Sequence, residues 1–199
     1  MAILNSYKKK DLRAYYKSLR ASLSKEQTRK MDQAILEQFR KIPIQNGGLK
    51  SALVYMPMHH INEVDTDLFI KYLQKEIQPA IQVAFPRTNF KTLDMEAILT
   101  KETGSFRENS LRLAEPVHGR LLAPQKVDIV LLPLLIFDKK GNRVGYGKGF
   151  YDRFLARCRP EVLKIGLSYL PPVPQIEDVG NFDIPLDYCA TPDRLYDFK

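Results

Sequence analysis

Two segments near the start of the chain place their apolar residues at helical spacing. Residues 8–23 carry one apolar stripe and set most of their lysines and arginines on the other face; the stripe holds Leu12, Tyr15 or Tyr16, Leu19 and Leu23. Residues 25–40 repeat the pattern, and Ser24 and Gln27 have the spacing of a capping box. The chain is therefore predicted to begin with two consecutive helices, the second of which starts directly after Ser24.

From residue 51 onward, short apolar runs alternate with helical patterns. Strands are predicted at 51–56, 81–86, 94–100, 127–133 and 162–168, with helices from Asp65 or Thr66 to Ile77 and from Tyr151 onward. This alternation predicts an α/β protein with a mostly parallel or mixed central sheet flanked by helices on both faces. No internal repeat and no linker divides residues 1–199, so one layered domain is expected.

The stretch from Phe137 to Leu155 is rich in glycine. Glycines at 141, 145, 147 and 149 are interleaved with Arg143 and Lys148, between an apolar strand and a helix that Tyr151 and Asp152 open. Glycine backbone approaches an anion closely, and its successive N–H groups can converge on one cluster of oxygens. Because a helix N-terminus faces the same point, the pattern favours a phosphate-binding loop at the carboxyl end of a strand.

Two familiar phosphate motifs do not fit this stretch. A Walker A loop needs Ser or Thr after its lysine, and Gly149 follows Lys148. A dinucleotide fingerprint needs glycine where Phe150 or Asp152 stands. A flexible surface turn with solvated charges stays open as the alternative, although loops often carry function.

The net charge of +8 is concentrated at the N-terminus, where residues 1–30 hold nine basic and two acidic residues. A basic helix can bind nucleic acid, but the second helix interleaves Glu26, Asp32 and Glu37 and no nucleic-acid motif is present. A solvated charged face is therefore expected, with no nucleic-acid partner. Lys9 and Arg13 are four residues apart on one side of the first helix, where they could clamp a polyphosphate or simply face water.

The expected location is the cytoplasm. The first ten residues lack the apolar segment of a signal peptide, and no apolar stretch approaches the ~18 residues of a membrane span. The two cysteines, Cys158 and Cys189, show no metal-binding spacing. Adjacent His59 and His60 do not converge on a metal as i, i+4 histidines do, so a solvated pair is expected.

The string GNRVGYGKGFYDRFL at 141–155 resembles the signature of the 5-formyltetrahydrofolate cyclo-ligase family. Shorter resemblances extend over most of the chain: KKDLR at 9–13, YMP at 55–57 with EVDT at 63–66, FPR at 85–87, AEP at 114–116 and FDIPLD at 182–187. The resemblance implies ATP- and Mg²⁺-dependent conversion of 5-formyltetrahydrofolate to 5,10-methenyltetrahydrofolate, with ADP and phosphate released. It implies small-molecule substrates, with ATP as co-substrate, and a monomer is expected.

The resemblance also implies site residues. The ATP-binding set would be Lys9, Lys10, Asp11, Leu12, Arg13, Arg143, Val144, Gly145, Tyr146, Gly147, Lys148, Gly149, Phe150 and Tyr151. The folate-binding set would be Met56, Glu63, Tyr146, Gly147, Lys148, Gly149 and Phe150. Catalysis would fall to Lys148 and Arg143, which would stabilise the charge of the transferred phosphoryl group.

Two carboxylates, Glu63 and Asp152, have both a structural and a functional interpretation, and a third, Asp183, has a functional one alone. The resemblance implies that Glu63 accepts hydrogen bonds from the amino-pyrimidine edge of the pterin. Without the resemblance, Glu63 would be expected only to interact with the dipole of the helix that follows it. Asp152 would stabilise a helix start through the helix dipole. Beside phosphates, however, its negative charge would be repelled unless a Mg²⁺ ion bridges the two. Asp183 is the second expected metal ligand, by resemblance alone, and follows Phe182 where relatives commonly have histidine.

From the residues alone, two alternative functions remain: a different ATP-dependent enzyme and a basic nucleic-acid-binding module.

Overall fold

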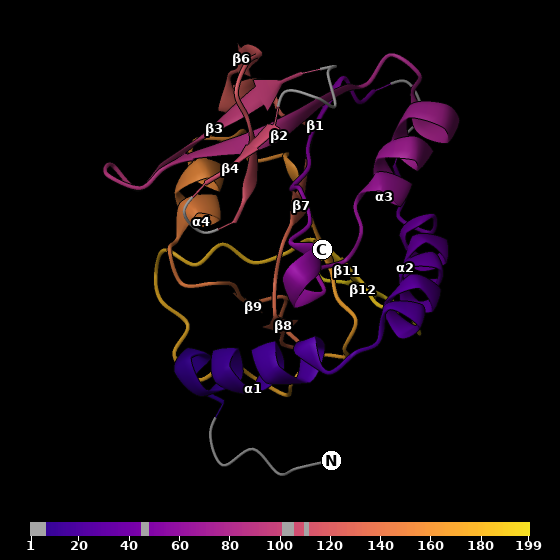
Figure 1. The fold of residues 1–199 in the computed structure, drawn as a ribbon, viewed down its shortest axis with the longest axis vertical. Helices are drawn as coiled ribbons and strands as arrows, with labels where there is room; N and C mark the ends of the chain where they lie inside the picture. The colour runs from indigo at the N-terminus through magenta and orange to yellow at the C-terminus, as the bar shows by residue number, and fades with distance from the viewer. Residues whose placement is uncertain (1–6, 45–47, 101–105, 110–111) are drawn as a thin grey trace.

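The computed structural model describes residues 7–44, 48–100, 106–109 and 112–199 (Figure 1). Its centre is an eight-stranded sheet of order β12-β11-β10-β7-β1-β2-β3-β6. The five strands β11, β10, β7, β1 and β2 are parallel, and β12, β3 and β6 add antiparallel edges. The bounds are β1 Ser51–Leu53, β2 Gln82–Asn89, β3 Asp94–Leu99, β6 Arg120–Leu122, β7 Ile129–Leu132, β10 Leu163–Leu167, β11 Tyr188–Ala190 and β12 Leu195–Asp197. The predicted α/β class with a mostly parallel sheet is confirmed.

Helices cover both faces of this sheet (Figure 1). On one face lie α2 (Lys25–Phe39), α3 (Asp67–Tyr72) and the π-helical turn η2 (Leu73–Ile77), and on the other lies α4 (Phe150–Leu155). Side chains of a strand alternate between faces. Accordingly Ile129 and Leu131 of β7 join the cluster beneath α2 and α3, while Val130 and Leu132 join the cluster beneath α4.

The N-terminal helix α1 (Lys9–Ala21) lies across the carboxyl ends of the parallel strands instead of on a face (Figure 1). Its Leu12 and Tyr16 pack on Ile136 and Val144 of the hairpin β8–β9. The predicted capping box is present, because Gln27 N–H donates to Ser24 Oγ and Ser24 N–H donates to the Gln27 side chain. Helix α1 therefore closes the sheet edge at which α/β proteins bind ligands.

The glycine stretch is interrupted in a way that the sequence analysis missed. Strands β8 (Ile136–Phe137) and β9 (Arg143–Val144) form a hairpin between β7 and the loop. Gly141, with φ +81°, lies in the hairpin turn, where the Asp138 carboxylate accepts N–H groups from Lys140 and Asn142. The phosphate-loop prediction for Gly141 is therefore wrong, and the loop is reduced to 145–149.

The remaining elements are short. They are η1 (His59–Ile61) within the predicted polar loop, the strand pair β4 (Phe106–Glu108) and β5 (Ala114–Pro116), and η3 (Pro124–Lys126). Helix α4 ends before Cys158, and β11 and β12 were not predicted. No described helix is long and apolar enough to cross a membrane. The expectation that the chain has no signal peptide rests on its first ten residues, of which 1–6 lie outside the described residues.

Candidate active site

A cavity of about 490 Å³ opens at the carboxyl-terminal edge of the sheet, between α1, the 145–149 loop, the 56–63 segment and β5. Fourteen of the predicted site residues line it: Lys9, Arg13, Met56, Glu63, Arg143, Gly145, Tyr146, Gly147, Lys148, Gly149, Phe150, Tyr151, Asp152 and Asp183. The other predicted residues do not line it, since Lys10 and Asp11 face solvent and Leu12 and Val144 lie in the core. Segments far apart in the sequence thus meet in one site.

Cations gather where α1 borders the cavity. Lys9, Arg13 and Lys17 recur every fourth residue and all line it, as residues on one helix face should. Arg13 Nε donates to the Gly145 carbonyl at 2.9 Å, and Lys9 Nζ pairs with Asp183. Among the described residues, no ion-pair partner is found for the exposed Lys148 ammonium. This end of the cavity therefore carries accessible positive charge.

The conformation of the loop depends on Gly147, whose φ is +89°. A Cβ atom at this position would lie 3.2 Å from Cζ of Arg13. A side chain would thus combine an unfavourable backbone conformation with a clash against α1. Glycine at 147 lets the loop pass directly beside the arginine.

At the α1 end of the cavity, the buried Arg143 forms an ion pair with the partly exposed Asp152. Arg143 is 9% exposed, and its Nη2 lies 2.8 Å from Asp152 Oδ1. Arg143 Nη1 also donates to the Ile184 carbonyl, and Ile184 N–H donates to Asp152 Oδ1 at 3.1 Å. The pair joins the hairpin, α4 and the segment that carries Asp183, so the guanidinium is already engaged by protein groups.

A second network surrounds Glu63, which is 6% exposed. Its Oε1 accepts the Tyr146 hydroxyl at 2.5 Å, and its Oε2 accepts Met58 N–H at 2.8 Å. Burial and the Glu63 charge raise the pKa of Tyr146, which keeps its hydroxyl protonated. The carboxylate is therefore fixed at the cavity wall with one acceptor position left on each oxygen.

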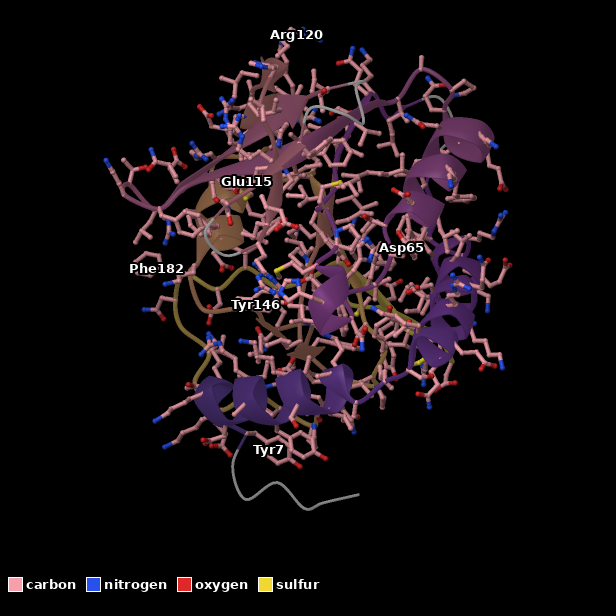
Figure 2. The ribbon with its side chains drawn as sticks, in the orientation of Figure 1. Tyr7, Asp65, Glu115, Arg120, Tyr146 and Phe182 are labelled. Atoms are coloured by element: carbon pink, nitrogen blue, oxygen red, sulfur yellow. The ribbon has the colours of Figure 1, made fainter. Side chains whose placement is uncertain are left out.

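Arg20 anchors this network and was not predicted. Its Nη2 donates to the Tyr146 hydroxyl at 2.5 Å, and its other nitrogens donate to Ile61 and Leu134 carbonyls at 2.9 and 3.2 Å. Figure 2 shows Tyr146 near the centre of the molecule, above α1. Residues 9, 13, 17 and 20 follow one helical row, and that spacing is the signal that could have identified Arg20.

The opposite wall was also missed by the sequence analysis. Glu115 of β5 lies higher than Tyr146 in Figure 2 and accepts Thr88 N–H of β2 at 2.9 Å. Thr88 and Glu115 line the cavity together with Pro86, Met95 and Leu113. This wall is more apolar than the α1 side, as expected for contact with a ring system.

The carboxylates Asp152 and Asp183 both line the cavity. Asp183 Oδ2 accepts Gly180 N–H at 2.5 Å as well as the Lys9 ammonium, and each aspartate keeps one oxygen without a hydrogen bond among the described residues. No group of three His, Cys, Asp or Glu side chains suited to a metal occurs in the described part of the chain. A metal here would need ligands from phosphate and water as well.

The profile of the 5-formyltetrahydrofolate cyclo-ligase family matches residues 5–187. The cyclo-ligase of Mus musculus is 30% identical over 157 residues, which cover 75% of this chain and 74% of the mouse protein. That of Haemophilus influenzae is 26% identical over 189 residues, or 92% and 97% of the two chains. The solved structure of the Aquifex aeolicus 5,10-methenyltetrahydrofolate synthetase has a TM-score of 0.74 at 27% identity and covers 96% of this chain and 93% of that one. A Mycoplasma pneumoniae synthetase, at 23% identity and a TM-score of 0.71, covers 92% and 98% and shares the fold.

Proposed function

The chain belongs to the 5-formyltetrahydrofolate cyclo-ligase family, and from that premise we propose that its 490 Å³ cavity is where the reaction takes place. The activity is the ATP-dependent conversion of 5-formyltetrahydrofolate to 5,10-methenyltetrahydrofolate, with ATP as co-substrate. The observation that carries the proposal is the presence of a cationic glycine loop and a fixed carboxylate in one cavity. A reaction between two bound ligands requires such a shared space.

ATP occupies the end bordered by α1. Lys9, Arg13, Lys17 and Lys148 line that end, and their charges suit a triphosphate. The positive φ of Gly147 carries the loop backbone past these side chains, and its N–H groups would bind phosphate oxygens. The Arg13 bond to Gly145 holds helix and loop together, so Arg13 both orders the loop and presents charge to the phosphates.

The folate occupies the end that contains Glu63. The free acceptor positions of this carboxylate suit the N–H groups of the pterin's amino-pyrimidine edge. Met56, Phe150 and the Gly147–Gly149 backbone border the same space, and Tyr146 reaches from the glycine loop to Glu63. The formyl group of the folate would then point toward the loop that holds the phosphates.

Mg²⁺ fits the two aspartates. Asp152 and Asp183 line the phosphate end, and each has an oxygen available. Mg²⁺ is commonly held by one or two carboxylates, phosphate oxygens and water, so these residues would hold it, and when bound it would neutralise phosphate charge. Arg143 was expected to be catalytic, but its Nη2 pairs with Asp152 and its Nη1 donates to the Ile184 carbonyl, and we propose that it positions Asp152 instead.

The chemistry requires activation of a formyl amide. The formyl oxygen attacks the γ-phosphorus of ATP and displaces ADP, which forms an N5-iminium phosphate. N10 then attacks the iminium carbon, N10 loses its proton, and the carbon–oxygen bond breaks as phosphate leaves. Lys148 and the loop N–H groups stabilise the phosphoryl charge during the first step, while Glu63 and Tyr146 hold the pterin in line.

The direct test is to mix the protein with MgATP and 5-formyltetrahydrofolate and to follow the absorbance of methenyltetrahydrofolate. We expect the absorbance to rise only when ATP is present and ADP to form in equal amount. Hydrolysis of ATP without that absorbance would indicate a different ATP-dependent enzyme. We propose a monomer as the active form and a cytoplasmic location, with which the two free cysteines agree.

A further inference from the structure

A buried acid lies behind Glu63, outside the cavity. Asp32 of α2 is 6% exposed, although the sequence analysis counted it among solvated charges. Its Oδ1 lies 2.7 Å from the Tyr169 hydroxyl and 3.3 Å from Asp65 N. The same hydroxyl lies 3.2 Å from the main-chain carbonyl oxygen of Glu63. Tyr169 therefore connects α2 to the backbone of the residue assigned to the pterin.

A tyrosine hydroxyl has a single hydrogen, and here it faces two acceptors. When Asp32 is ionised, its carboxylate competes for that hydrogen over the shorter distance, and the Glu63 carbonyl is left without a donor. When Asp32 is protonated, it can donate to the Tyr169 oxygen, and the hydroxyl hydrogen can turn to the Glu63 carbonyl. The protonation state of Asp32 thus decides whether the Glu63 backbone is held.

We propose that Asp32 and Tyr169 are positioning residues for Glu63, acting through the shared hydroxyl hydrogen. This inference rests on the proposed role of Glu63 as the pterin ligand. Neither residue lines the main cavity or touches the substrates, so both act through the Glu63 main chain.

The Glu63 backbone is a suitable target for such control. Tyr55 donates to the next carbonyl, that of Val64, at 3.4 Å, so two tyrosines hold two successive peptide groups. Between them a small cavity of about 10 Å³ is bordered by Arg20, Glu63 and Tyr169. This space is close to the lower limit for one water molecule. The peptide group therefore borders a small gap in the packing.

Burial raises the pKa of Asp32 to about 6, and the nearby Asp65 carboxylate adds to the effect. The Tyr169 hydroxyl, Asp65 N–H and His59 act in the opposite direction. The pKa of Tyr169 itself is raised by burial and by Asp32, with Arg20 opposing, so Tyr169 keeps its hydrogen throughout. The Glu63 carbonyl should gain its donor as pH falls through about 6 and lose it as pH rises.

The test is calorimetric titration with 5-formyltetrahydrofolate, without ATP, between about pH 5 and 8. For the unmodified protein we expect affinity to be roughly three- to tenfold higher below the transition than above it, the effect of one hydrogen bond. Tyr169→Phe should bind at the weaker level at every pH. Asp32→Asn, which cannot titrate, should lose the pH transition.

Controls separate the possible failures. His59→Gln and His60→Gln should keep the transition, and its loss in either would assign it to that histidine and overturn the inference. Normal folate binding in Glu63→Gln would overturn the proposed site itself. Weakened binding in Glu63→Gln, together with an unchanged pH profile in both Tyr169→Phe and Asp32→Asn, would overturn the positioning role alone. Thermal unfolding checks each fold, and Asp32→Asn carries the test if Tyr169→Phe does not fold.

Discussion

The two ends of the cavity hold their charged groups in opposite ways. At the α1 end, Lys17 and Lys148 are exposed and have no ion-pair partner among the described residues. At the other end, Glu63 and Arg20 are 6% and 5% exposed, and both are fixed by hydrogen bonds. The α1 end thus combines exposed ammonium groups with the ion pairs Lys9–Asp183 and Arg143–Asp152, whereas Glu63 and Arg20 at the other end are both buried and hydrogen-bonded.

The difference follows from the chemistry of the two proposed ligands. A triphosphate carries several negative charges, and flexible ammonium groups attract it from many orientations. A pterin edge is neutral, so its recognition depends on acceptors placed at the correct angle before it arrives. At the folate end, the planar guanidinium of Arg20 donates hydrogen bonds to three acceptors. These bonds hold Tyr146, and through it Glu63, in position. Each substitution predicted below alters one of the two ends or the tyrosine that connects them.

The largest effect is expected from Lys148→Ala at the phosphate end. A charged contact that strengthens in the transition state contributes about 2–4 kcal/mol, so turnover should fall on the order of 10²- to 10³-fold. Because Lys148 is exposed, the melting temperature should not change. Steady-state kinetics measure the effect, and Lys30→Ala on α2 is the matched control because it removes the same charge outside the cavity. Unchanged kinetics would remove Lys148 from the site.

At the folate end, Glu63→Gln should weaken binding of 5-formyltetrahydrofolate by about 10- to 100-fold, as expected for hydrogen bonds to a charged acceptor. The amide cannot accept from both Tyr146 and Met58, since one of its two positions is now a donor. ATP affinity should stay within about twofold. Calorimetry with each ligand separately measures both, and an equal loss for the two ligands would contradict the division of the cavity.

Asp152→Asn tests whether the phosphate end depends on a metal. The Mg²⁺ concentration for half-maximal rate should rise on the order of tenfold, because one anionic ligand is lost. The variant also breaks the pair with the buried Arg143, so stability should fall as well. A lower melting temperature with an unchanged Mg²⁺ dependence would leave Asp152 with a purely structural role.

The sequence predicted the elements that leave a long or chemically marked pattern. The Ser24 capping box, the apolar stripe of α1 and the apolar run of β7 were all found where expected. The hairpin β8–β9 was missed because its strands have two residues each, too few for a period to show. Strands β11 and β12 have three each, and β11 depends on parallel pairing with β10 while β12 pairs only with β11.

The site was predictable where a motif marked it. The glycine loop was predicted from its spacing of glycines and cations and Glu63 through resemblance, and both line one cavity. Arg20 and Asp32 were not identified, because in sequence they are ordinary charges on amphipathic helices. Only the packing of α1 and α2 against the 58–65 segment turns them inward. The helical row of residues 9, 13, 17 and 20 could have pointed to Arg20, but no local pattern distinguishes Asp32 from the exposed acids of α2, because its burial depends on tertiary structure.

The smallest expected effect concerns Tyr146, which belongs to both ends. It lies in the glycine loop, yet its hydroxyl is bonded to Glu63 and Arg20. If ATP orders the loop, it should also fix Glu63, and each ligand should then raise the affinity of the other by the same factor. Tyr146→Phe removes the connecting hydroxyl while the ring stays in place, so folate affinity should fall by roughly threefold to fivefold, as for one hydrogen bond.

The more telling measurement is folate affinity with and without a non-hydrolysable ATP analogue. In the unmodified protein the analogue should tighten folate binding, and in Tyr146→Phe this gain should disappear while ATP affinity alone is kept. Tyr15→Phe, which alters a tyrosine of α1 outside the cavity lining, should keep the gain. A gain of equal size in Tyr146→Phe would mean that the coupling does not pass through this hydroxyl, and the absence of a gain in the unmodified protein would mean that the two ends bind their ligands independently.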